Sequence, residues 1–467
     1  MGLNVEIHNI MIKGYKPYSP NQIYLFPPSP QEWLPKDHIV YFISDLVDNL
    51  DLSTIYKDYE KETRGQPPYH PALMTKILFY AYSRGIFSSR KIASRLYEEV
   101  AFIVLAGGNK PDFRTVNEFR RRHIKTLPNI FVQILNICEK AGLVGLKHVS
   151  LDGTKINANA SKHSAMSYGR MKTEEERLEK EIKKLLEKAN RLDLKEDKLY
   201  GKDRRGDEIP EELALQETRL KKIKEAKAAL AAEARLAWEE DKKEKDDDNK
   251  SDPPLTPPQG KVKYYKKTGE PIDKAQRNFT DPESRIMKNS DKAFVQAYNA
   301  QAVVDAKNQI ILAAEVTNQA GDSQHLPIML EMVKENIWRY PKELSADAGY
   351  FSEANLKYLK RKTDAYIAAE RIKHNQKPEP APRGRIPVDL PLPDLMRRKL
   401  RTKAGWAKYA LRKQVVEPVF GQIKEIRGFR RFLLRGLDLV RGEWLLLCLT
   451  HNILKLYRNR KKVVFAK

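Results

Sequence analysis

Two short apolar runs, far apart in the chain, each lead into an aspartate. Residues 149–151 precede Asp152, residues 344–346 precede Asp347, and a glycine follows each aspartate within two residues. Short apolar runs bounded in this way are typical of buried strands. We therefore expect a sheet in which both aspartates stand where a strand emerges from it.

A third carboxylate, Glu417, belongs to a segment whose pattern predicts a helix. Three carboxylates that converge at the end of a sheet suit divalent cations, because hard metals prefer oxygen ligands. Two such ions about 4 Å apart clamp the attacking and leaving oxygens of a phosphodiester. The residues therefore predict phosphoryl transfer on a nucleic acid, with two ions of Mg²⁺ (or Mn²⁺) as the cofactor.

The charge of the chain fits that partner. The chain has 86 Lys and Arg against 62 Asp and Glu, and its pI is near 9.6. Such a protein is drawn to polyphosphate, because binding releases counterions. A membrane surface also attracts positive charge, but no run approaches the roughly 20 apolar residues of a membrane-spanning helix. Because the N-terminus has no signal-peptide pattern, we expect a cytoplasmic protein associated with the nucleoid.

Residues 1–145 are predicted to form a helical DNA-binding domain. Helices are expected on both sides of Gly85, and the second of them, Ser89–Leu96, is basic and amphipathic. Two helices joined by a tight turn with glycine resemble a helix-turn-helix, in which Arg90 and Arg95 would contact DNA. Simple packing within a helical bundle is the alternative.

A later helix of the same region is expected to start at Thr115, with Thr115 and Glu118 as its capping box. This helix carries Arg120, Arg121 and Arg122. These arginines are interpreted either as phosphate contacts or as an ordinary solvated face.

Residues 146–467 are predicted to form the catalytic domain, interrupted by an insertion over residues 165–260. Apolar residues between 173 and 240 form two stripes with steps of three and four, which predicts an antiparallel helical hairpin of the coiled-coil kind. Thr173 and Glu176 are expected to cap its first helix. The charged run at 241–250 and the prolines that follow predict a disordered linker.

Strand patterns resume after the linker. Residues 294–305 and 310–316 predict an antiparallel hairpin, and Asp322 and Ser323 are expected to cap a helix. The remaining expected elements are the strand before Asp347, a helix at 352–360, a strand at 365–368 and a long helix with Glu417. This order of elements resembles an RNase H-like catalytic domain, of the α+β or α/β class.

Several segments resemble insertion-sequence transposases of the Asp-Asp-Glu type. They are LDGTKINANAS (151–161), NFTDPESR (278–285), YNAQ (298–301), SADAGY (345–350) and EPVFGQIK (417–424). The N-terminal helices are similar to those of InsH-like transposases. The resemblance implies metal-dependent cleavage at the terminal inverted repeats of a mobile element and strand transfer into target DNA, by a homodimer or a higher assembly. It also implies that Asp152, Asp347 and Glu417 are the metal ligands.

The resemblance further implies a DNA-contacting role for Lys424. In the family, three residues often separate an arginine from the catalytic glutamate, but four residues separate Arg412 from Glu417 here. Lys413 stands at the regular spacing, so either Arg412 or Lys413 is expected to face DNA. Pro418 directly after the glutamate predicts a kink. The other basic residues expected at DNA are Lys155, Arg427, Arg430 and Arg431.

Alternatives to this interpretation follow from the same residues. An aspartate with a glycine one or two residues after it is common in turns, so either aspartate is by itself compatible with a purely structural role. Asp305, at a strand end, is a competing ligand that we interpret as part of a turn. An RNase H-like nuclease or resolvase would share the metal chemistry without joining DNA, and a domesticated DNA-binding protein would keep only the basic surface.

Overall fold

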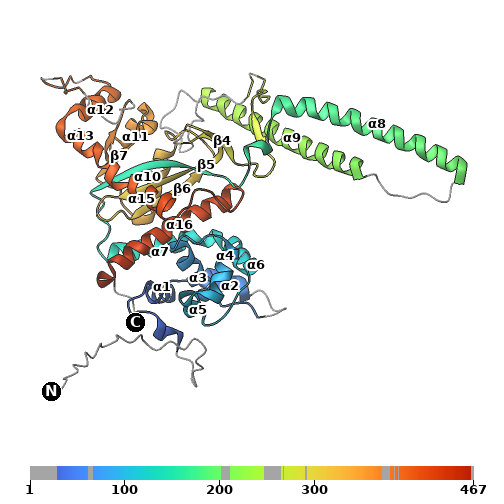
Figure 1. The fold of residues 1–467 in the computed structure, drawn as a ribbon. Coiled ribbons are helices and arrows are strands. Elements are labelled where there is room, and N and C mark those ends of the chain that lie inside the picture. Colours follow the sequence, from blue (N-terminus) through green and yellow to red (C-terminus); the bar gives the residue numbers. More distant parts are fainter. Residues whose placement is uncertain are drawn as a thin grey trace, which may run out of the picture.

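The structure is a computed structural model that describes residues 29–60, 67–200, 211–246, 265–266, 268–289, 292–370, 379–382, 384–387 and 389–463. Its body combines a six-stranded sheet with many helices. A long helical hairpin projects from this body, and the N-terminal helices lie on the far side of helix α16 from the sheet (Figure 1).

The central sheet consists of β1 (His148–Asn157), β4 (Arg285–Lys288), β5 (Phe294–Asp305), β6 (Ile311–Thr317), β7 (Glu343–Ala346) and β8 (Asp364–Ile367). β1 lies at its centre, antiparallel to β5 and parallel to β7. β4 and β6 both pair with the other edge of β5, and β8 extends the sheet beyond β7 in parallel. The order β6–β5–β1–β7–β8 is consistent with the RNase H-like domain expected from the sequence.

The strand predictions hold with one correction. The antiparallel hairpin expected after the insertion is confirmed as β5 and β6. β7 ends directly before Asp347, as predicted, but β1 does not end at Asp152. It continues to Asn157, because residues 153–157 go on pairing with β5.

The N-terminal region is helical, as predicted. Its helices are α1 (Ile39–Asp48), α2 (Ser53–Glu60), α3 (Pro71–Ser83), α4 (Ser89–Glu98), α5 (Val100–Ala106), α6 (Phe113–Arg122) and α7 (Leu127–Lys140). α4 is amphipathic, because it buries Ile92 and Leu96 and exposes Arg90 and Arg95. The turn before it contains Gly85, whose φ of +77° favours glycine. A Cβ on Gly85 would also lie 2.7 Å from the carbonyl oxygen of Arg427, so this turn is docked on the C-terminal part of the chain.

α6 begins two residues before the predicted start. Its N-cap is Asp112, whose side chain accepts a hydrogen bond from the Thr115 amide at 2.7 Å. The predicted capping box of Thr115 and Glu118 is therefore wrong, because an aspartate that precedes the helix already binds the orphan donor.

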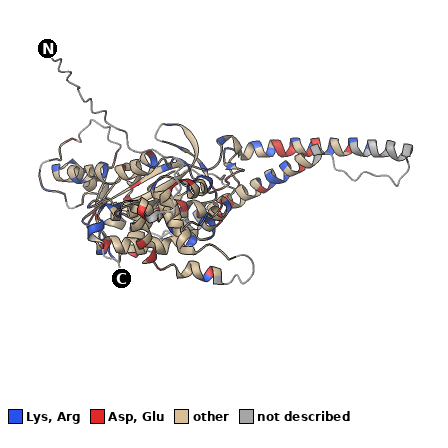
Figure 2. Ribbon diagram, turned by 60° about the horizontal axis from the view of Figure 1, so that its bottom comes forward, with Lys and Arg blue, Asp and Glu red and all other residues tan. Residues whose placement is uncertain are grey.

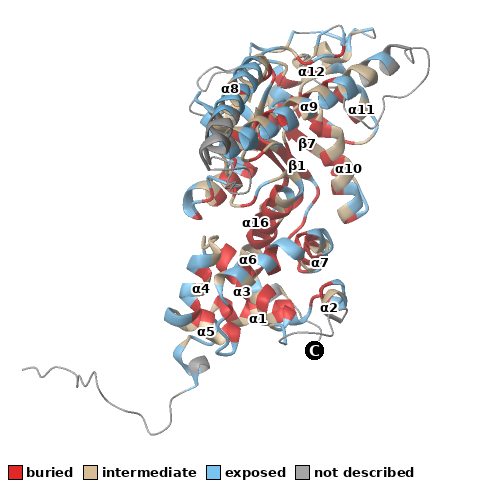
Figure 3. Ribbon diagram, turned by 90° about the vertical axis from the view of Figure 1, so that its right-hand side faces the viewer, coloured by how far each residue is buried: buried red, intermediate tan, exposed pale blue. Residues whose placement is uncertain are grey.

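Helix α16 (Leu437–Arg458) joins the N-terminal helices to the sheet. It packs against α3 and α7 on one side and against β6 on the other, and Figure 3 shows it buried along much of its length. The Trp444 indole N–H donates to the Gln301 carbonyl of β5 at 3.0 Å. One continuous hydrophobic core therefore runs from α1 to α16. In the described part of the chain, neither α16 nor another helix has the length and apolarity needed to cross a membrane.

The insertion forms an antiparallel helical hairpin, α8 (Tyr168–Tyr200) and α9 (Glu211–Asp246). Leu178 of α8 packs with Ile223 and Leu230 of α9. Ion pairs flank this seam, including Lys227 with Glu175 at 2.5 Å, and both signs of charge line the hairpin (Figure 2). At its base, β2 (Ala165–Ser167) pairs with β3 (Gln276–Asn278).

Two details of the insertion differ from the prediction. α8 starts at Tyr168, so Thr173 and Glu176 lie inside the helix and do not cap it. Residues 241–246 of the predicted linker belong to α9, because the helical pattern continues through the charged run. The rest of the predicted linker and the predicted turn at 201–210 lie outside the described residues.

The region of Glu417 consists of short helices. They are α12 (Leu392–Arg401), α13 (Lys403–Ala410), α14 (Arg412–Val415), α15 (Glu417–Gly421) and a π-helical turn at Gln422–Ile426. The single long helix predicted here is therefore wrong, but the predicted kink is confirmed, because the helix is interrupted at Val416. Pro418 is tolerated in the first turn of α15, where its missing N–H has no intrahelical acceptor. Elsewhere in the domain, α10 (His325–Ile337) and α11 (Glu353–Leu359) pack together.

A buried charged cluster connects the N-terminal helices to α16. Arg120 of α6 is only 6% exposed, and its Nη1 donates to the Tyr82 hydroxyl at 2.8 Å and lies 3.8 Å from Oε1 of Glu443. Glu443 is fully buried and also accepts hydrogen bonds from the amides of Leu433 and Leu434. Burial raises the pKa of Glu443, and the guanidinium of Arg120 opposes that effect. Arg120 is therefore structural, not a phosphate contact or a solvated residue.

We predict that Arg120→Ala destabilises the protein by about 3–5 kcal/mol, because it leaves the buried Glu443 carboxylate without a countercharge. The measurement is chemical denaturation. In the variant, protonation of Glu443 removes the uncompensated charge. Because the folded-state pKa of Glu443 is raised, the loss of unfolding free energy relative to the wild type should become smaller as the pH falls. Arg121→Ala, an exposed neighbour, should stay within about 0.5 kcal/mol of the wild type. Equal effects of both substitutions would contradict this account.

Candidate active site

Asp152 and Asp347 are neighbours because β1 and β7 run parallel. Leu151 pairs with Ala346, so the next residue along each strand is an aspartate. The backbone of Asp347 is extended (φ −71°, ψ 166°), which continues the alternation of side chains beyond the end of β7. Both carboxylates therefore project from the same face of the sheet.

The same face carries a ladder of polar pairs that leads to the aspartates. His148 Nδ1 lies 3.0 Å from Glu343 Oε2, and the hydroxyl oxygens of Ser150 and Ser345 lie 2.8 Å apart. His148 Nε2 connects the two pairs, at 3.0 Å from Ser345 Oγ. Burial lowers the pKa of His148. Because His148 and both serines are buried and hydrogen bonded to one another, they fix the spacing of the two strands beside the carboxylates.

The short helices α13 to α15 bring Arg412 and Glu417 to this face. Arg412 Nη1 donates to Asp152 Oδ2 at 3.1 Å, and its Nη2 lies 3.4 Å from Glu417 Oε1. The guanidinium therefore joins the first and third carboxylates. The side chains of Asp152 and Arg412 are 16% and 13% exposed, whereas that of Glu417 is 43% exposed. The site consequently opens to solvent on the side of Glu417.

The electrostatics of the site reflect the crowding of carboxylates. Burial raises the pKa of Asp152 to about 7, with the charges of Asp347 and Asp322 acting in the same direction and Arg412 acting against them. Burial would lower the pKa of Arg412, but Asp152, Asp347 and Glu417 together raise it. One guanidinium thus faces three carboxylates, so the site carries an excess of negative charge.

The donors suit a divalent cation, because Mg²⁺ and Mn²⁺ prefer carboxylate oxygens. Within the described residues, however, no group of three acidic, histidine or cysteine side chains is arranged closely enough to hold an ion. The Arg412 guanidinium lies between Asp152 and Glu417. A monovalent cationic side chain therefore stands where a divalent ion is expected.

Two family models match the chain. The transposase domain DUF772 matches residues 28–122, and the transposase DDE domain matches residues 261–453, which include Asp347 and Glu417. The chain belongs to the Asp-Asp-Glu transposases of insertion sequences. Comparison with curated proteins and with solved structures gives no significant match. Asp152 precedes the second match, so its place in the transposase site depends on the pairing of β1 with β7.

The opposite face of β1 in the transposase holds a polar layer that the sequence did not predict. Gly153 pairs with Gln301, and a side chain at position 153 would overlap the Gln301 amide. Asp322 accepts hydrogen bonds from Gln301 at 3.0 Å and from Lys155 at 3.1 Å. A Cβ on Gly349 would lie 3.1 Å from Asp322 Oδ2. Both glycines are therefore closely packed beneath the site, so that a side chain at either position would need Gln301 or Asp322 to shift, and neither has the positive φ of a glycine turn.

Asp322 is the residue that sequence reasoning missed. The prediction that it caps a helix is wrong, because α10 begins at His325 and has Gln324 at its N-cap. An aspartate shortly before a helix has the same sequence signature whether it caps that helix or binds a neighbouring strand. Its interaction with Lys155 shows that this predicted DNA contact is already held by a carboxylate.

Of the other predicted DNA contacts, some lie at the site and others are exposed to solvent. Lys424 lies at the site, since its Nζ donates to Thr154 Oγ1 of β1 at 3.1 Å. Arg412 faces the carboxylates, while Lys413 is exposed. Arg430 and Arg431 are also exposed, and Arg430 forms an ion pair with Glu425.

Arg427 is a correction. Its guanidinium is buried and donates to the Leu447 carbonyl at 3.2 Å and to Thr450 Oγ1 at 2.9 Å. Burial lowers its pKa to about 10. The prediction that Arg427 holds DNA phosphates is wrong, because this side chain is bonded to α16 inside the protein.

Asp305 is part of a turn, as predicted. It is buried, and its carboxylate accepts hydrogen bonds from the amides of Leu146 at 2.7 Å and Lys307 at 2.8 Å. Because backbone donors hold both oxygens, Asp305 fixes the connection between β5 and β6 and the start of β1.

We predict that Arg412→Ala increases the affinity of the DNA-free transposase for Mn²⁺ by about fivefold or more. The substitution removes a positive charge that competes for the same carboxylates. Titration followed by the electron paramagnetic resonance of free Mn²⁺ measures the effect. Lys413→Ala removes the same charge from an exposed neighbour and should change the affinity much less. Equal affinities of the Arg412 variant and the wild type would contradict competition.

Proposed function

We propose that Asp152, Asp347 and Glu417 are the metal ligands and catalytic residues with which this transposase cuts element ends and joins them to target DNA. The observation that supports this most directly is the Arg412 guanidinium, which contacts Asp152 and Glu417 and is influenced by Asp347. The three carboxylates thus interact with one guanidinium, although they come from three distant segments of the chain. Transposases of this family generally use divalent metals, and we propose two ions of Mg²⁺ or Mn²⁺.

Two divalent ions held in this way would activate the attacking water or 3′-hydroxyl and stabilise the leaving oxygen. The protein supplies position and charge. Asp152 and Asp347 are fixed by the strand register, whereas Glu417 stands at the exposed start of α15. Arg412, once displaced from the carboxylates, and Lys424 beside Thr154 are placed to neutralise the phosphate that reacts.

The wider assignments belong to the same proposal. Residues 1–145 form the DNA-binding part, with a helix-turn-helix at α3 and α4, and residues 146–467 form an RNase H-like catalytic domain interrupted at 165–260. DNA is the substrate of the family, and association with the nucleoid follows from the charge of +24.

We predict that Asp152→Asn, Asp347→Asn and Glu417→Gln each reduce cleavage and joining by at least about a thousandfold, because an amide keeps the size but loses the charge that binds metal. Binding to element ends should persist. The measurement is cleavage and strand transfer on labelled element ends with Mg²⁺. Glu353→Gln, an exposed acid on α11, is the matched control and should remain active. Full activity of any one of the three variants would remove that residue from the site, and cleavage without joining by the wild type would favour a nuclease.

We also propose that the α8–α9 hairpin holds two transposases together at paired ends. The seam between the helices is closed near the base, but Leu186 of α8 and Leu215 of α9 are exposed further out. Exposed apolar side chains on both helices suit contact with a second protein. Concerted joining of two element ends needs two active sites in one complex. The partner that contacts these leucines is therefore a second copy of this transposase.

We predict that replacing residues 184–218 with a short Gly-Ser linker leaves a folded protein that cuts single ends but loses paired-end complexes and concerted joining. The base stays intact, because Leu178, Ile223 and Leu230 and the pair of Glu175 with Lys227 lie outside the deletion. Native gels of end complexes and a joining assay measure the outcome, and circular dichroism checks the fold. Normal pairing by the shortened protein would exclude the hairpin as the assembly element.

A further inference from the structure

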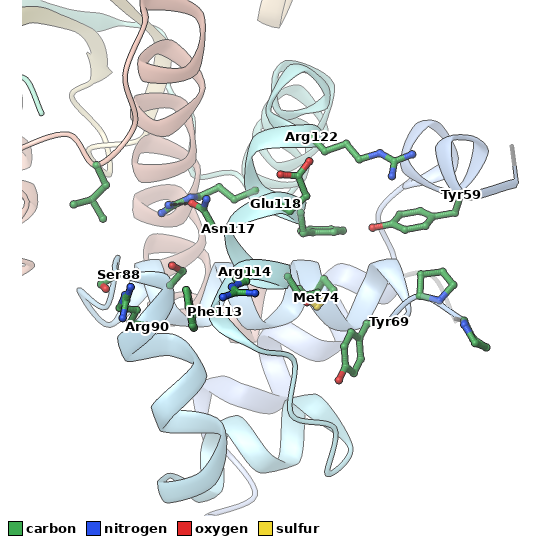
Figure 4. Close-up of a pocket in the computed structure, with 17 residues that line it drawn as sticks. Tyr59, Tyr69, Met74, Ser88, Arg90, Phe113, Arg114, Asn117, Glu118 and Arg122 are labelled. Atoms are coloured by element: carbon green, nitrogen blue, oxygen red, sulfur yellow. Dashed lines mark hydrogen bonds between the residues drawn. The ribbon is translucent and has the colours of Figure 1, made fainter. Parts of the chain in front are cut away.

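A cleft of about 920 Å³ opens between the first turn of α4, the length of α6 and the segment before α3. Four arginines line it, Arg90 from α4 and Arg114, Arg120 and Arg122 from α6. Figure 4 labels the three of them other than the buried Arg120. Tyr59 of α2 lines it from a third helix, and Leu433 lines it from the C-terminal part of the chain. The cleft therefore lies where the N-terminal helices meet the catalytic part.

Aromatic rings hold the guanidinium groups of this cleft in place. Arg90 lies 4.5 Å and Arg114 lies 5.7 Å from the centre of the Phe113 ring, and Arg122 lies 5.1 Å from the centre of the Tyr59 ring. A guanidinium stacked on a ring can present the N–H groups on its edge, and that fork matches the oxygens of a phosphate. Arg122 already uses its Nη2 to donate to the Asp58 carbonyl at 3.0 Å. Within the described residues, neither Arg90 nor Arg114 forms an ion pair with a carboxylate.

The backbone adds donors to the same cleft. α4 begins at Ser89 after an N-cap, Ser88, whose side chain makes no capping hydrogen bond. The Ser88 side chain therefore accepts no hydrogen bond from the amides of the first turn, and Ser88, Ser89 and Arg90, at the positive end of the helix dipole, line the cleft.

The cleft is connected to the active site by direct contacts. Phe87, next to Ser88, packs against Phe429 with ring centres 5.0 Å apart. Arg431, two residues after Phe429, forms a β-bridge with Asn157 at the end of β1. β1 then leads back to Asp152, so packed elements join the wall of the cleft to the strand that carries this carboxylate.

We propose that this cleft binds the sugar-phosphate backbone of the element-end duplex, with Arg90 and Arg114 as phosphate contacts. The proposal rests on the proposed function, because it assumes that element ends are the substrate. It differs from contact through the outward face of α4, where Arg95 is already paired with Glu99 at 2.5 Å. Arg114 lines only the cleft, and Arg95 lies only on the outward face of α4. Substitutions of these two residues therefore distinguish DNA binding in the cleft from DNA binding on the outward face.

One carboxylate also lines the cleft, Glu118 of α6. A carboxylate repels phosphate, so the cleft does not bind DNA at its maximal affinity. Glu118→Gln removes that repulsion and should strengthen binding to DNA of any sequence. If Glu118 instead accepted a hydrogen bond from the exocyclic amine of a base, Glu118→Gln would weaken binding.

The test is fluorescence anisotropy of labelled element-end duplexes with Ca²⁺ in place of Mg²⁺, over a series of salt concentrations. Arg114→Ala should weaken binding about tenfold and reduce the slope of log affinity against log salt by about 1, because one phosphate contact is lost. Arg121→Ala, on the same helix but outside the cleft, should change neither quantity. Phe113→Leu keeps every charge but releases Arg90 and Arg114, and should weaken binding by a smaller factor.

The possible outcomes test the cleft separately from the proposed catalytic function. Loss of binding in Arg95→Ala with normal binding in Arg114→Ala would overturn the cleft and favour the outward face of α4. Equal losses in Arg114→Ala and Arg121→Ala would show only an effect of net charge and would also overturn it. If inorganic phosphate at millimolar concentration displaces the duplex in a competition arm, the cleft binds free phosphate and the proposal fails. Activity of Asp152→Asn would contradict the proposed function and leave these binding results unaffected.

Discussion

The parallel pairing of β1 with β7 is the constraint on which the active site depends. Because Leu151 and Ala346 are partners, the two aspartates that follow them are neighbours whatever the surrounding loops do. The buried pair of Ser150 and Ser345 fixes the same register one step earlier. A slip of one residue would turn one carboxylate to the opposite face of the sheet. Two acids separated by nearly 200 residues of sequence are therefore set by the hydrogen bonds of one strand pair.

The crowding of carboxylates that this register produces has to be balanced by a cation. Burial disfavours the charge of Asp152, and a second aspartate beside it adds repulsion. Arg412 provides the balance in the structure described, through contacts with Asp152 and Glu417. A guanidinium is singly charged, so it neutralises this site less completely than a divalent ion does.

The sequence predicted the parts of the site that local pattern controls. The apolar run before Asp347 identified a strand end, and Pro418 identified the break before Glu417. The continuation of β1 past Asp152 was not predictable, because Gly153 gives no strand signal and the segment is held by pairing with β5. The choice between Arg412 and Lys413 also required the structure, since the interruption at Val416 shifts the helical phase that spacing assumes.

Burial explains the remaining differences between prediction and structure. Arg120 and Arg427 look in sequence like any other arginine of a basic protein, yet both are buried against α16. Local sequence shows the charge of a side chain but not which surface another helix covers. Only the arginines that are not buried are therefore candidates for contact with DNA. Among them, Arg114 is distinguished from Arg121 only by the cleft that it lines.

The shared core of the transposase limits how DNA binding can be coupled to catalysis. α16 packs against both the N-terminal helices and the sheet, and Gly85 is in close contact with Arg427. A junction packed in this way fixes the distance between the cleft and the carboxylates and leaves little room for rigid-body motion. Coupling between two sites requires an element with two arrangements that both ligands bias. We propose that Arg412 is such an element, because its guanidinium contacts both Asp152 and Glu417. DNA and metal would then assist each other's binding through one side chain, while the backbone between the two sites stays as it is.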